Sequence, residues 1–189
     1  MNRRNLIKFA GSALLNAAVV GGGAVAILRP AHATPPAPRA ANDARLLSFV
    51  NTHTGETYAG AYWQNGAYVT EELAAINQVM RDHRSGEVHE IDPRLLDQLH
   101  TLRGAVNATS PFQIISGYRS AESNAGLAAA SSGVATRSLH MQGRAIDIRV
   151  SGVELPRLRD AALAMNAGGV GYYESSNFIH IDTGRVRRW

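Results

Sequence analysis

Cysteine is absent from this chain of 189 residues. No disulfide can therefore stabilise the fold and no thiolate can bind a metal, so any metal site must use His, Asp or Glu. The sequence contains no internal repeat and no low-complexity run. Its length is sufficient for one domain with a hydrophobic core of its own.

Acidic residues are missing from the first 33 positions, which begin with a basic segment containing Arg3 and Arg4. An uncharged segment, residues 9–28, follows, and then the small-residue pattern Ala31-His32-Ala33. This order is typical of an export signal that is cleaved after the small residues. The paired arginines resemble the twin-arginine signal, which sends folded proteins across the bacterial inner membrane.

The sequence therefore predicts three segments: a twin-arginine export signal at 1–33, a flexible mature N-terminus at 34–44, and a folded domain at 45–189. Alternatively, residues 9–28 remain as an uncleaved anchor, because twenty uncharged residues can just span a bilayer. We favour cleavage, since the cleavage pattern is present and three consecutive glycines weaken a helix there. We then expect the twin-arginine translocase as a partner, a periplasmic location in a Gram-negative bacterium, and no stable membrane span after cleavage.

A surplus of positive charge is missing from the predicted mature part. Four of the 19 basic residues lie in the signal, which leaves 15 basic residues against 15 acidic ones. Binding to nucleic acid depends strongly on excess positive charge. We therefore expect no nucleic-acid partner.

Hydrophobic spacing and turn residues predict an α+β domain in which helices pack on a small antiparallel sheet. Thr70 is expected to cap the first helix and Ser85-Gly86 to end it, while Asp92-Pro93 begins the second. The last residues, "RVRRW", are expected to form a packed and solvated tail. The predicted elements are a hairpin at 45–68, helices at 70–85, 92–102, 121–130 and 156–166, and strands at 112–116, 143–150, 169–173 and 177–182.

Two predicted strands carry a polar residue among apolar ones. Asp147 alternates with isoleucines in "GRAIDIRV", and His180 alternates with isoleucines in "NFIHID". A half-buried strand places alternate residues on opposite faces, so each polar side chain faces away from its isoleucine neighbours. If the two strands pair, Asp147 and His180 converge, and His140 in the loop before the first strand can join them. Two imidazoles, one carboxylate and an open fourth position make a catalytic zinc site.

Three motifs then carry a resemblance to a known family: "SGYRS" from Ser116, "SLHMQGRAIDI" from Ser138 and "FIHIDTGRVRRW" from Phe178. They resemble, in order, the motifs of the LAS metallopeptidases, which include zinc D-Ala-D-Ala carboxypeptidases and murein endopeptidases. The similarity is greatest to the exported YcbK-like branch and covers residues 45–189. It implies the LAS fold, shared by hedgehog and D-Ala-D-Ala peptidases.

By this resemblance, His140, Asp147 and His180 are the ligands of Zn²⁺, and Arg119 holds a substrate carboxylate or the developing oxyanion. Tyr118, Ser138 and Gln142 are expected to contact the substrate or shape its site. The implied activity is hydrolysis of peptide bonds in peptidoglycan stem peptides or cross-links by a metal-activated water. Cleavage of a terminal D-amino acid, as by a carboxypeptidase, is the nearest alternative.

The general base departs from the family pattern. Many relatives have a glutamate three residues before the last ligand, where this chain has Asn177, an amide that cannot accept a proton. We favour His180 as ligand with Asp182 as proton acceptor or as the group that orients His180. In the other assignment Asp182 binds zinc and His180 carries protons, and Glu174 is a third candidate base. Asn177 also motivates a different hypothesis, a non-catalytic murein-binding or metal-binding module.

Overall fold

The computed structural model describes residues 43–131 and 133–189. The predicted export signal and the start of the predicted flexible N-terminus lie outside the described residues. Within the described residues, no helix is both long enough and apolar enough to cross a membrane. The helices are α1 (Thr70–Val79), α2 (Pro93–Ala105), α3 (Ala121–Ala130), the short 3-10 helix η1 (Leu139–Gln142) and α4 (Leu155–Ala164); the strands are β1 (Arg45–Asn51), β2 (Thr57–Gln64), β3 (Ala67–Tyr68), β4 (Phe112–Ser116), β5 (Ala145–Val150), β6 (Gly169–Tyr173), β7 (Phe178–Asp182) and β8 (Arg187–Arg188).

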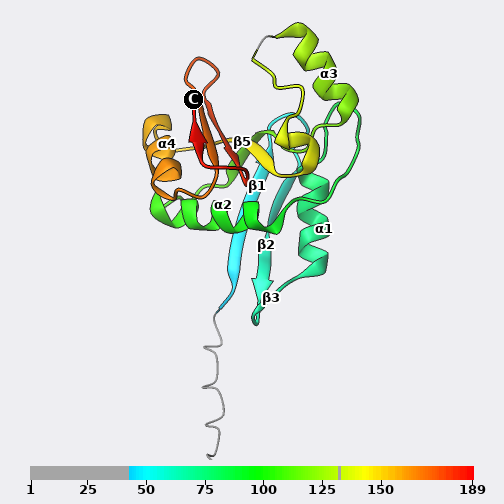
Figure 1. Cartoon of the computed structure of the whole chain (residues 1–189). Coiled ribbons are helices and arrows are strands. Elements are labelled where there is room, and N and C mark those ends of the chain that lie inside the picture. The colour runs from blue at the N-terminus through cyan, green and yellow to red at the C-terminus, as the bar shows by residue number, and fades with distance from the viewer. Residues whose placement is uncertain (1–42, 132) are drawn as a thin grey trace, which may run out of the picture. The chain divides into compact units, whose positions relative to one another are not determined.

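The described strands form one sheet in the order β3-β2-β1-β4-β5-β7-β6-β8. The pairings β1–β4 and β6–β8 are parallel and the others are antiparallel. The predicted α+β class is confirmed, with a mixed sheet in place of a purely antiparallel one. Helix α2 crosses one face of this sheet in front of β1, and α3 projects beyond it (Figure 1).

The hairpin at the start of the domain turns where the sequence predicts. Asn65 and Gly66 connect β2 to β3 with φ angles of 52° and 83°, and Gly55 has a φ of 74° between β1 and β2. Asparagine and glycine tolerate this left-handed backbone better than other residues do. The turn residues therefore set the register of the first strands.

The hydrophobic core lies between the helices and one face of the sheet. Asp92 accepts a hydrogen bond from the backbone N–H of Arg94, and Pro93 occupies the first turn of α2, as predicted. The inner side of α2 is fully buried against strand residues such as Phe49 on β1. The buried residues of α2 are Leu95, Leu96, Leu99 and Leu102.

Strands β5 and β7 divide their residues between this core and the opposite face. Ile146 pairs with Ile181, and both side chains belong to the core. The residues between these isoleucines project to the other face, because side chains alternate along a strand. That second face is buried as well, since Asp147 is only 6% exposed, so the expectation of a half-buried strand is wrong for β5.

Helix α1 differs from the prediction in its cap residue and in its C-terminal end. Thr70 is its first residue, Val69 occupies the cap position without a side-chain hydrogen bond, and the helix ends at Val79. The next residues leave the helix because the buried carboxylate of Asp82 accepts hydrogen bonds from the backbone N–H groups of Arg84 and Ser120. The second of these partners is distant in sequence, so local spacing could not reveal it.

The C-terminal segment, expected to be a packed and solvated tail, is largely exposed but also contains a short strand that the sequence did not predict. Strand β8 pairs in parallel with β6, with Gly169 opposite Arg187 and Val170 opposite Arg188. The backbone N–H of Trp189 donates to the carbonyl of Val170, which extends the pairing to the last residue. The end of the chain is thus an edge strand of the sheet.

Gly117 provides a test of the packing between β4 and α1. A Cβ atom at Gly117 would overlap the backbone carbonyl of Met80, the same oxygen that accepts from the N–H of Tyr118. We expect Gly117→Ala to lower the free energy of unfolding by about 1–3 kcal/mol, because backbone must move to admit the methyl group. Urea denaturation measures this change.

Gly126→Ala is the matched control. Gly126 is exposed inside α3, and a Cβ there meets no atom within 4 Å. Alanine favours a helix over glycine by about 0.5–1 kcal/mol, so this variant should be as stable as the parent or more so. Equal losses of stability in both variants would contradict the packing argument.

Candidate metal centre

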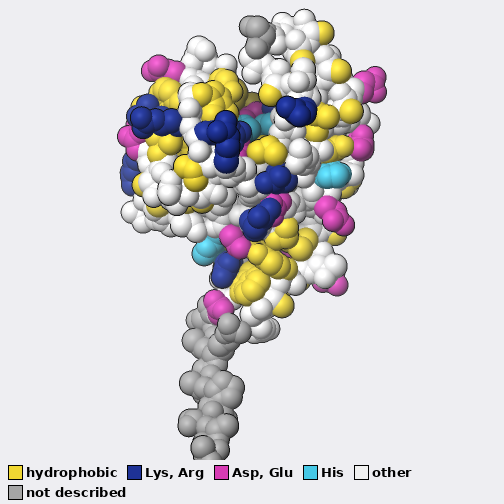
Figure 2. All heavy atoms as spheres, in the orientation of Figure 1, with side chains coloured by type: hydrophobic (Ala, Val, Ile, Leu, Met, Phe, Trp, Pro, Cys, Tyr) yellow, Lys and Arg dark blue, Asp and Glu magenta, His cyan; other side chains and the backbone are white. Residues whose placement is uncertain are grey.

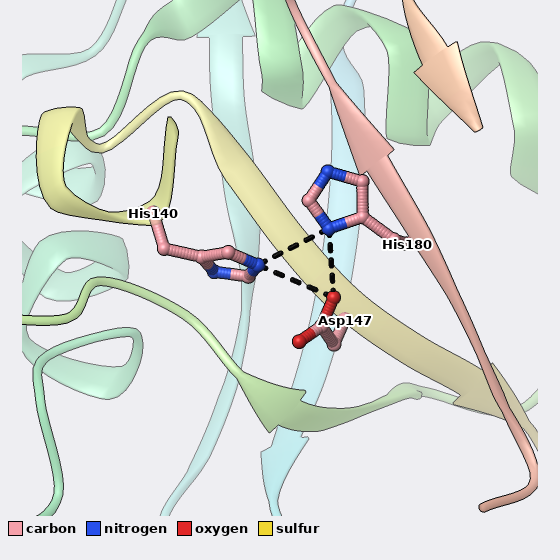
Figure 3. A group of neighbouring side chains, drawn as sticks. All are labelled: His140, Asp147 and His180. Atoms are coloured by element: carbon pink, nitrogen blue, oxygen red, sulfur yellow. Dashed lines mark hydrogen bonds and ion pairs between the residues drawn. The ribbon is translucent and has the colours of Figure 1, made fainter. Parts of the chain in front are cut away.

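Three elements bring His140, Asp147 and His180 together. His140 is on η1, Asp147 on β5 and His180 on β7 (Figure 3). Asp147 and His180 are direct partners in the antiparallel pairing of β5 with β7. The convergence that the alternating sequence pattern predicts is therefore present, and it occurs on the sheet face opposite the isoleucines.

One nitrogen or oxygen atom from each residue faces the other two. Asp147 Oδ1 lies 2.9 Å from His180 Nδ1 and 3.2 Å from His140 Nε2, and the two nitrogens are 3.2 Å apart. Ligand atoms around a tetrahedral zinc ion are about 3.3 Å apart when the bonds are about 2.0–2.1 Å long. The three atoms thus need only a small expansion to hold such an ion.

The outer nitrogens of both histidines are already engaged. His140 Nδ1 donates to the carbonyl of Gly117 at 2.7 Å, and His180 Nε2 donates to Asp182 Oδ2 at 2.9 Å. These bonds set the tautomer of each ring, so that His140 Nε2 and His180 Nδ1 are the atoms left to bind a ligand. Two nitrogen lone pairs and a carboxylate oxygen repel one another unless positive charge lies between them. The donor set therefore fits a cation.

The electrostatics of the site agree with that requirement. Burial alone would raise the pKa of Asp147, but His140 and His180 outweigh burial and hold that pKa well below its usual range. Burial lowers the pKa of His140, which favours its neutral, metal-binding form. Burial would also lower the pKa of His180, but hydrogen bonds to Asp147 and Asp182 raise it. A proton on His180 meets the need for positive charge in part, and a divalent cation would meet it fully.

Asp182 is completely buried behind His180. Its Oδ1 accepts from the backbone N–H groups of Gly169 and Gly184 at 3.0 and 2.8 Å, while its Oδ2 accepts from His180. Arg187 on β8 binds both oxygens, at 3.0 and 2.6 Å. Every strong acceptor direction of this carboxylate is used, and it faces the side of His180 that is turned away from Asp147.

Arg119 lies beside the three residues but is largely buried, with 8% of its surface exposed. Its Nη2 donates to Asp147 Oδ2 at 3.1 Å, and its Nε donates to Ser116 Oγ at 3.0 Å. The guanidinium thus binds the oxygen of Asp147 that does not face the histidines. It also lines the same cleft as the three residues.

Of the three other residues that we expected to contact the substrate, one lines the cleft and two do not. Ser138 lines the cleft and caps η1 by accepting from the N–H of His140. Tyr118 is buried away from the cleft, where its hydroxyl donates to Glu87. Gln142 accepts from Arg144 and does not line the cleft.

The third candidate base, Glu174, is also remote from the site. Glu174 and its neighbour on the same turn, Asn177, are exposed, and they line a different cavity, which lies next to the end of β5. Among the described residues that line the cleft, Asp147 is the single one with a carboxylate side chain. The cleft itself has a volume of about 630 Å³. Histidine side chains lie within a hollow of the surface that has basic side chains around it (Figure 2).

Two residues near the site were not expected from the sequence: Arg187, which binds Asp182, and Trp189, whose ring centroid lies 5.2 Å from that of His180. Both also line the cleft. The available signal was the buried Asp182 itself, since a buried carboxylate needs a cation or several donors. Arginines three, five and six residues later were the nearest candidates.

Known proteins are similar to this chain in sequence. The family model described as peptidoglycan L,D-endopeptidase MepK matches residues 39–189. The peptidoglycan L,D-endopeptidase MepK of Escherichia coli strain K12 is 45% identical over 188 residues, which cover 100% of this chain and 97% of that protein. The probable peptidoglycan L,D-endopeptidase MepK of Haemophilus influenzae is 41% identical over 148 residues, 77% of this chain and 78% of that protein.

The matched region contains every element that builds the three-residue cluster, from β1 to Trp189. The resemblance drawn from the three sequence motifs is thereby confirmed. This chain belongs to the M15-type peptidase family whose model is described as peptidoglycan L,D-endopeptidase MepK.

Proposed function

We propose that this chain is a zinc-dependent endopeptidase that hydrolyses amide bonds in peptidoglycan cross-links. The single observation that carries the proposal is the cluster of His140, Asp147 and His180, whose facing atoms lie 2.9–3.2 Å apart at the base of a cleft. The family membership supports the substrate class, since the relatives are named for an L,D-endopeptidase activity on peptidoglycan. The same names favour internal cleavage over removal of a terminal D-amino acid.

In this proposal His140 Nε2, Asp147 Oδ1 and His180 Nδ1 hold the zinc ion. When bound, zinc lowers the pKa of a coordinated water and polarises the scissile carbonyl. Arg119 keeps Asp147 in place by binding its second oxygen. The positive charge of Arg119, close to the ligands, also favours the negative charge that develops on the carbonyl oxygen.

We infer that Asp182 orients His180 and does not accept the proton of the water. The support is its burial, the donors that occupy both its oxygens, and its position behind His180. Its pKa points the same way: burial would raise it, but His180, Arg187 and two backbone N–H groups lower it, so the group is a poor base. His180 then serves as ligand, as in the favoured assignment from the sequence. Of the two roles which that assignment gave Asp182, proton acceptor or the group that orients His180, we keep the second.

A second function, a murein-binding module without catalysis, is favoured by one observation. No described residue that lines the cleft supplies a side-chain carboxylate other than Asp147, and Glu174 lies at a different cavity. The two functions differ in whether peptide bonds are cut. Digestion of purified sacculi separates them.

The first prediction from the proposed function concerns loss of the metal. The zinc-loaded mature chain, residues 34–189, should release new muropeptides from sacculi, and a chelator should abolish the release. Asp147→Asn should bind zinc at least about tenfold more weakly, because an amide is a poor substitute for a carboxylate ligand. Elemental analysis and chromatography of the digests measure the two effects. Muropeptide release at full rate by metal-free protein would refute zinc catalysis, and binding to sacculi without any release would support the binding module.

The second prediction concerns the support of His180. We expect Asp182→Asn to reduce zinc affinity by about 10–100-fold, the usual effect of removing the hydrogen-bond partner of a ligand histidine. Arg187→Lys should cause a smaller loss, since lysine cannot bind both oxygens of Asp182 at once. Competition with a chromophoric chelator measures affinity without any need for activity.

Arg188→Lys is the matched control, because Arg188 is the exposed neighbour on the same strand. Its zinc affinity should equal that of the parent protein. Unchanged affinity in Asp182→Asn would show that His180 needs no support from this carboxylate.

We also propose that the chain is exported through the twin-arginine route and acts in the periplasm. The support is the basic start with Arg3 and Arg4, the uncharged segment and the pattern Ala31-His32-Ala33. A substrate in the cell wall requires such a location.

The prediction from this proposal is that exchange of both Arg3 and Arg4 for lysine retains the protein in the cytoplasm, because the twin-arginine receptor reads the guanidinium pair. Cell fractionation and N-terminal sequencing of the exported protein, expected to begin at Thr34, measure the outcome. Exchange of Arg29 for lysine serves as the control and should not affect export. Normal export of the double variant would exclude this route.

A further inference from the structure

Trp189, the last residue, is a large apolar side chain in an unusual position. Its surface is 50% exposed, although the indole lies at the cleft that holds the proposed metal ligands. The ring centroid is 5.2 Å from that of His180. Exposed aromatic rings at a binding cleft are frequent points of contact with a ligand.

Several contacts fix the orientation of the indole in advance. Its Nε1 donates to the hydroxyl of Tyr173 at 2.8 Å, and the guanidinium of Arg187 lies 4.8 Å from the ring centroid. The backbone is held on β6, since the N–H of Tyr172 donates to the carbonyl of Trp189. A Cβ atom at Gly171 would overlap the indole, so the glycine leaves the space that the ring occupies. An ordered ring loses little entropy when a ligand binds.

Two further aromatic residues extend this surface. Tyr173 on β6 and Phe178 on β7 stack with their centroids 4.6 Å apart, and both line the cleft. We call Tyr173, Phe178 and Trp189 the aromatic wall. It bounds the cleft on the side of His180, while Arg119 and Arg137 also line the cleft and carry positive charge.

We propose that the aromatic wall, with Trp189 as its main contact, binds the hydrocarbon part of the stem-peptide residue next to the scissile bond. This inference rests on the proposed function, because it assumes that a peptide bond lies over His140, Asp147 and His180. Consecutive residues of an extended peptide are about 3.3–3.6 Å apart, so the residue beside such a bond must pass close to the indole. Trp189 is then a specificity residue, because it contacts the substrate without taking part in proton transfer.

A sugar ring is the other ligand that commonly packs on tryptophan. The glycan is joined to the start of the stem peptide, whereas a cross-link lies further along it. An indole so close to His180 therefore meets the peptide before the glycan. The carboxylates of the stem peptide also match the positive charge of the cleft, which is lined by Arg119, Arg137 and Arg187.

The test uses the zinc-loaded mature chain and soluble cross-linked peptide dimers that carry no sugar. For Trp189→Ala we expect the KM to rise about tenfold and kcat to change much less, because the lost contact is apolar and is made before the chemical step. Trp189→Phe should show a smaller rise, since it keeps an apolar ring. The control is Trp63→Phe, because Trp63 is on β2, which is separated from β8 by five strands and from β6 by four in the sheet order.

A second readout does not require turnover. The chain has two tryptophans, so Trp63→Phe leaves Trp189 as the only one. Rapid mixing of that variant with the peptide dimer should change its emission before product forms, and mixing with a peptide-free disaccharide glycan should not. A response to the glycan but not to the peptide would overturn the assignment to peptide. Thermal unfolding and zinc content of each variant check the fold, and the emission test decides if Trp189→Ala does not fold.

The outcomes separate this inference from the proposed function. Hydrolysis with wild-type kinetics by Trp189→Ala, or product formation without a change in Trp189 emission, overturns the role of the aromatic wall alone. An emission change without any hydrolysis by the parent protein supports the aromatic wall and overturns the endopeptidase. If the protein shows no emission change and no hydrolysis, both the role of the aromatic wall and the endopeptidase are overturned.

Discussion

The pairing of β5 with β7 in one particular register is the constraint on which the site depends. In that register Asp147 lies opposite His180, and the flanking isoleucines lie opposite each other. A shift by one residue would turn Asp147 toward the hydrophobic core and an isoleucine toward the site. Burial of an unpaired carboxylate costs several kcal/mol, so the core enforces the register that also assembles the site. Stability of the sheet and arrangement of the ligands are thus consequences of the same alternation.

Charge balance then determines which side chains surround the site. Two buried carboxylates, Asp147 and Asp182, lie on the same sheet face, on either side of the His180 ring. Each has an arginine on its outer side, Arg119 for Asp147 and Arg187 for Asp182. Because Arg119 binds Oδ2 of Asp147, Oδ1 of Asp147 is free to face both histidines. Each ligand is thus held by a partner outside the cluster, an arrangement that favours a preorganised site.

The sequence was sufficient to predict the parts of the site that depend on alternation. Asp147 and His180 each interrupt a run of isoleucines, and a period of two is a strong signal even in a strand of five or six residues. Strand β8 gave no such signal, because it has only two residues. Its parallel partner in the sheet is β6, and β7 lies between the two strands in the sequence. The early end of α1 depends on Asp82 bonding to Ser120, and the position of Tyr118 depends on its bond to Glu87. These contacts join residues more than thirty positions apart, which spacing along the chain does not encode.

Strand β8 is too short for backbone pairing alone to define its register, and two side-chain contacts define it instead. Strand β8 contributes Arg187 to the buried Asp182, and the alternation of side chains then places Trp189 on the same side and Arg188 on the other. A shift by one residue would put Arg188 beside Asp182 and move the indole away from the space above Gly171. The ion pair with Asp182 and the gap at Gly171 therefore select the same register. Because Asp182 also holds His180, the position of the indole at the cleft and the orientation of a proposed zinc ligand depend on one short strand at the end of the chain.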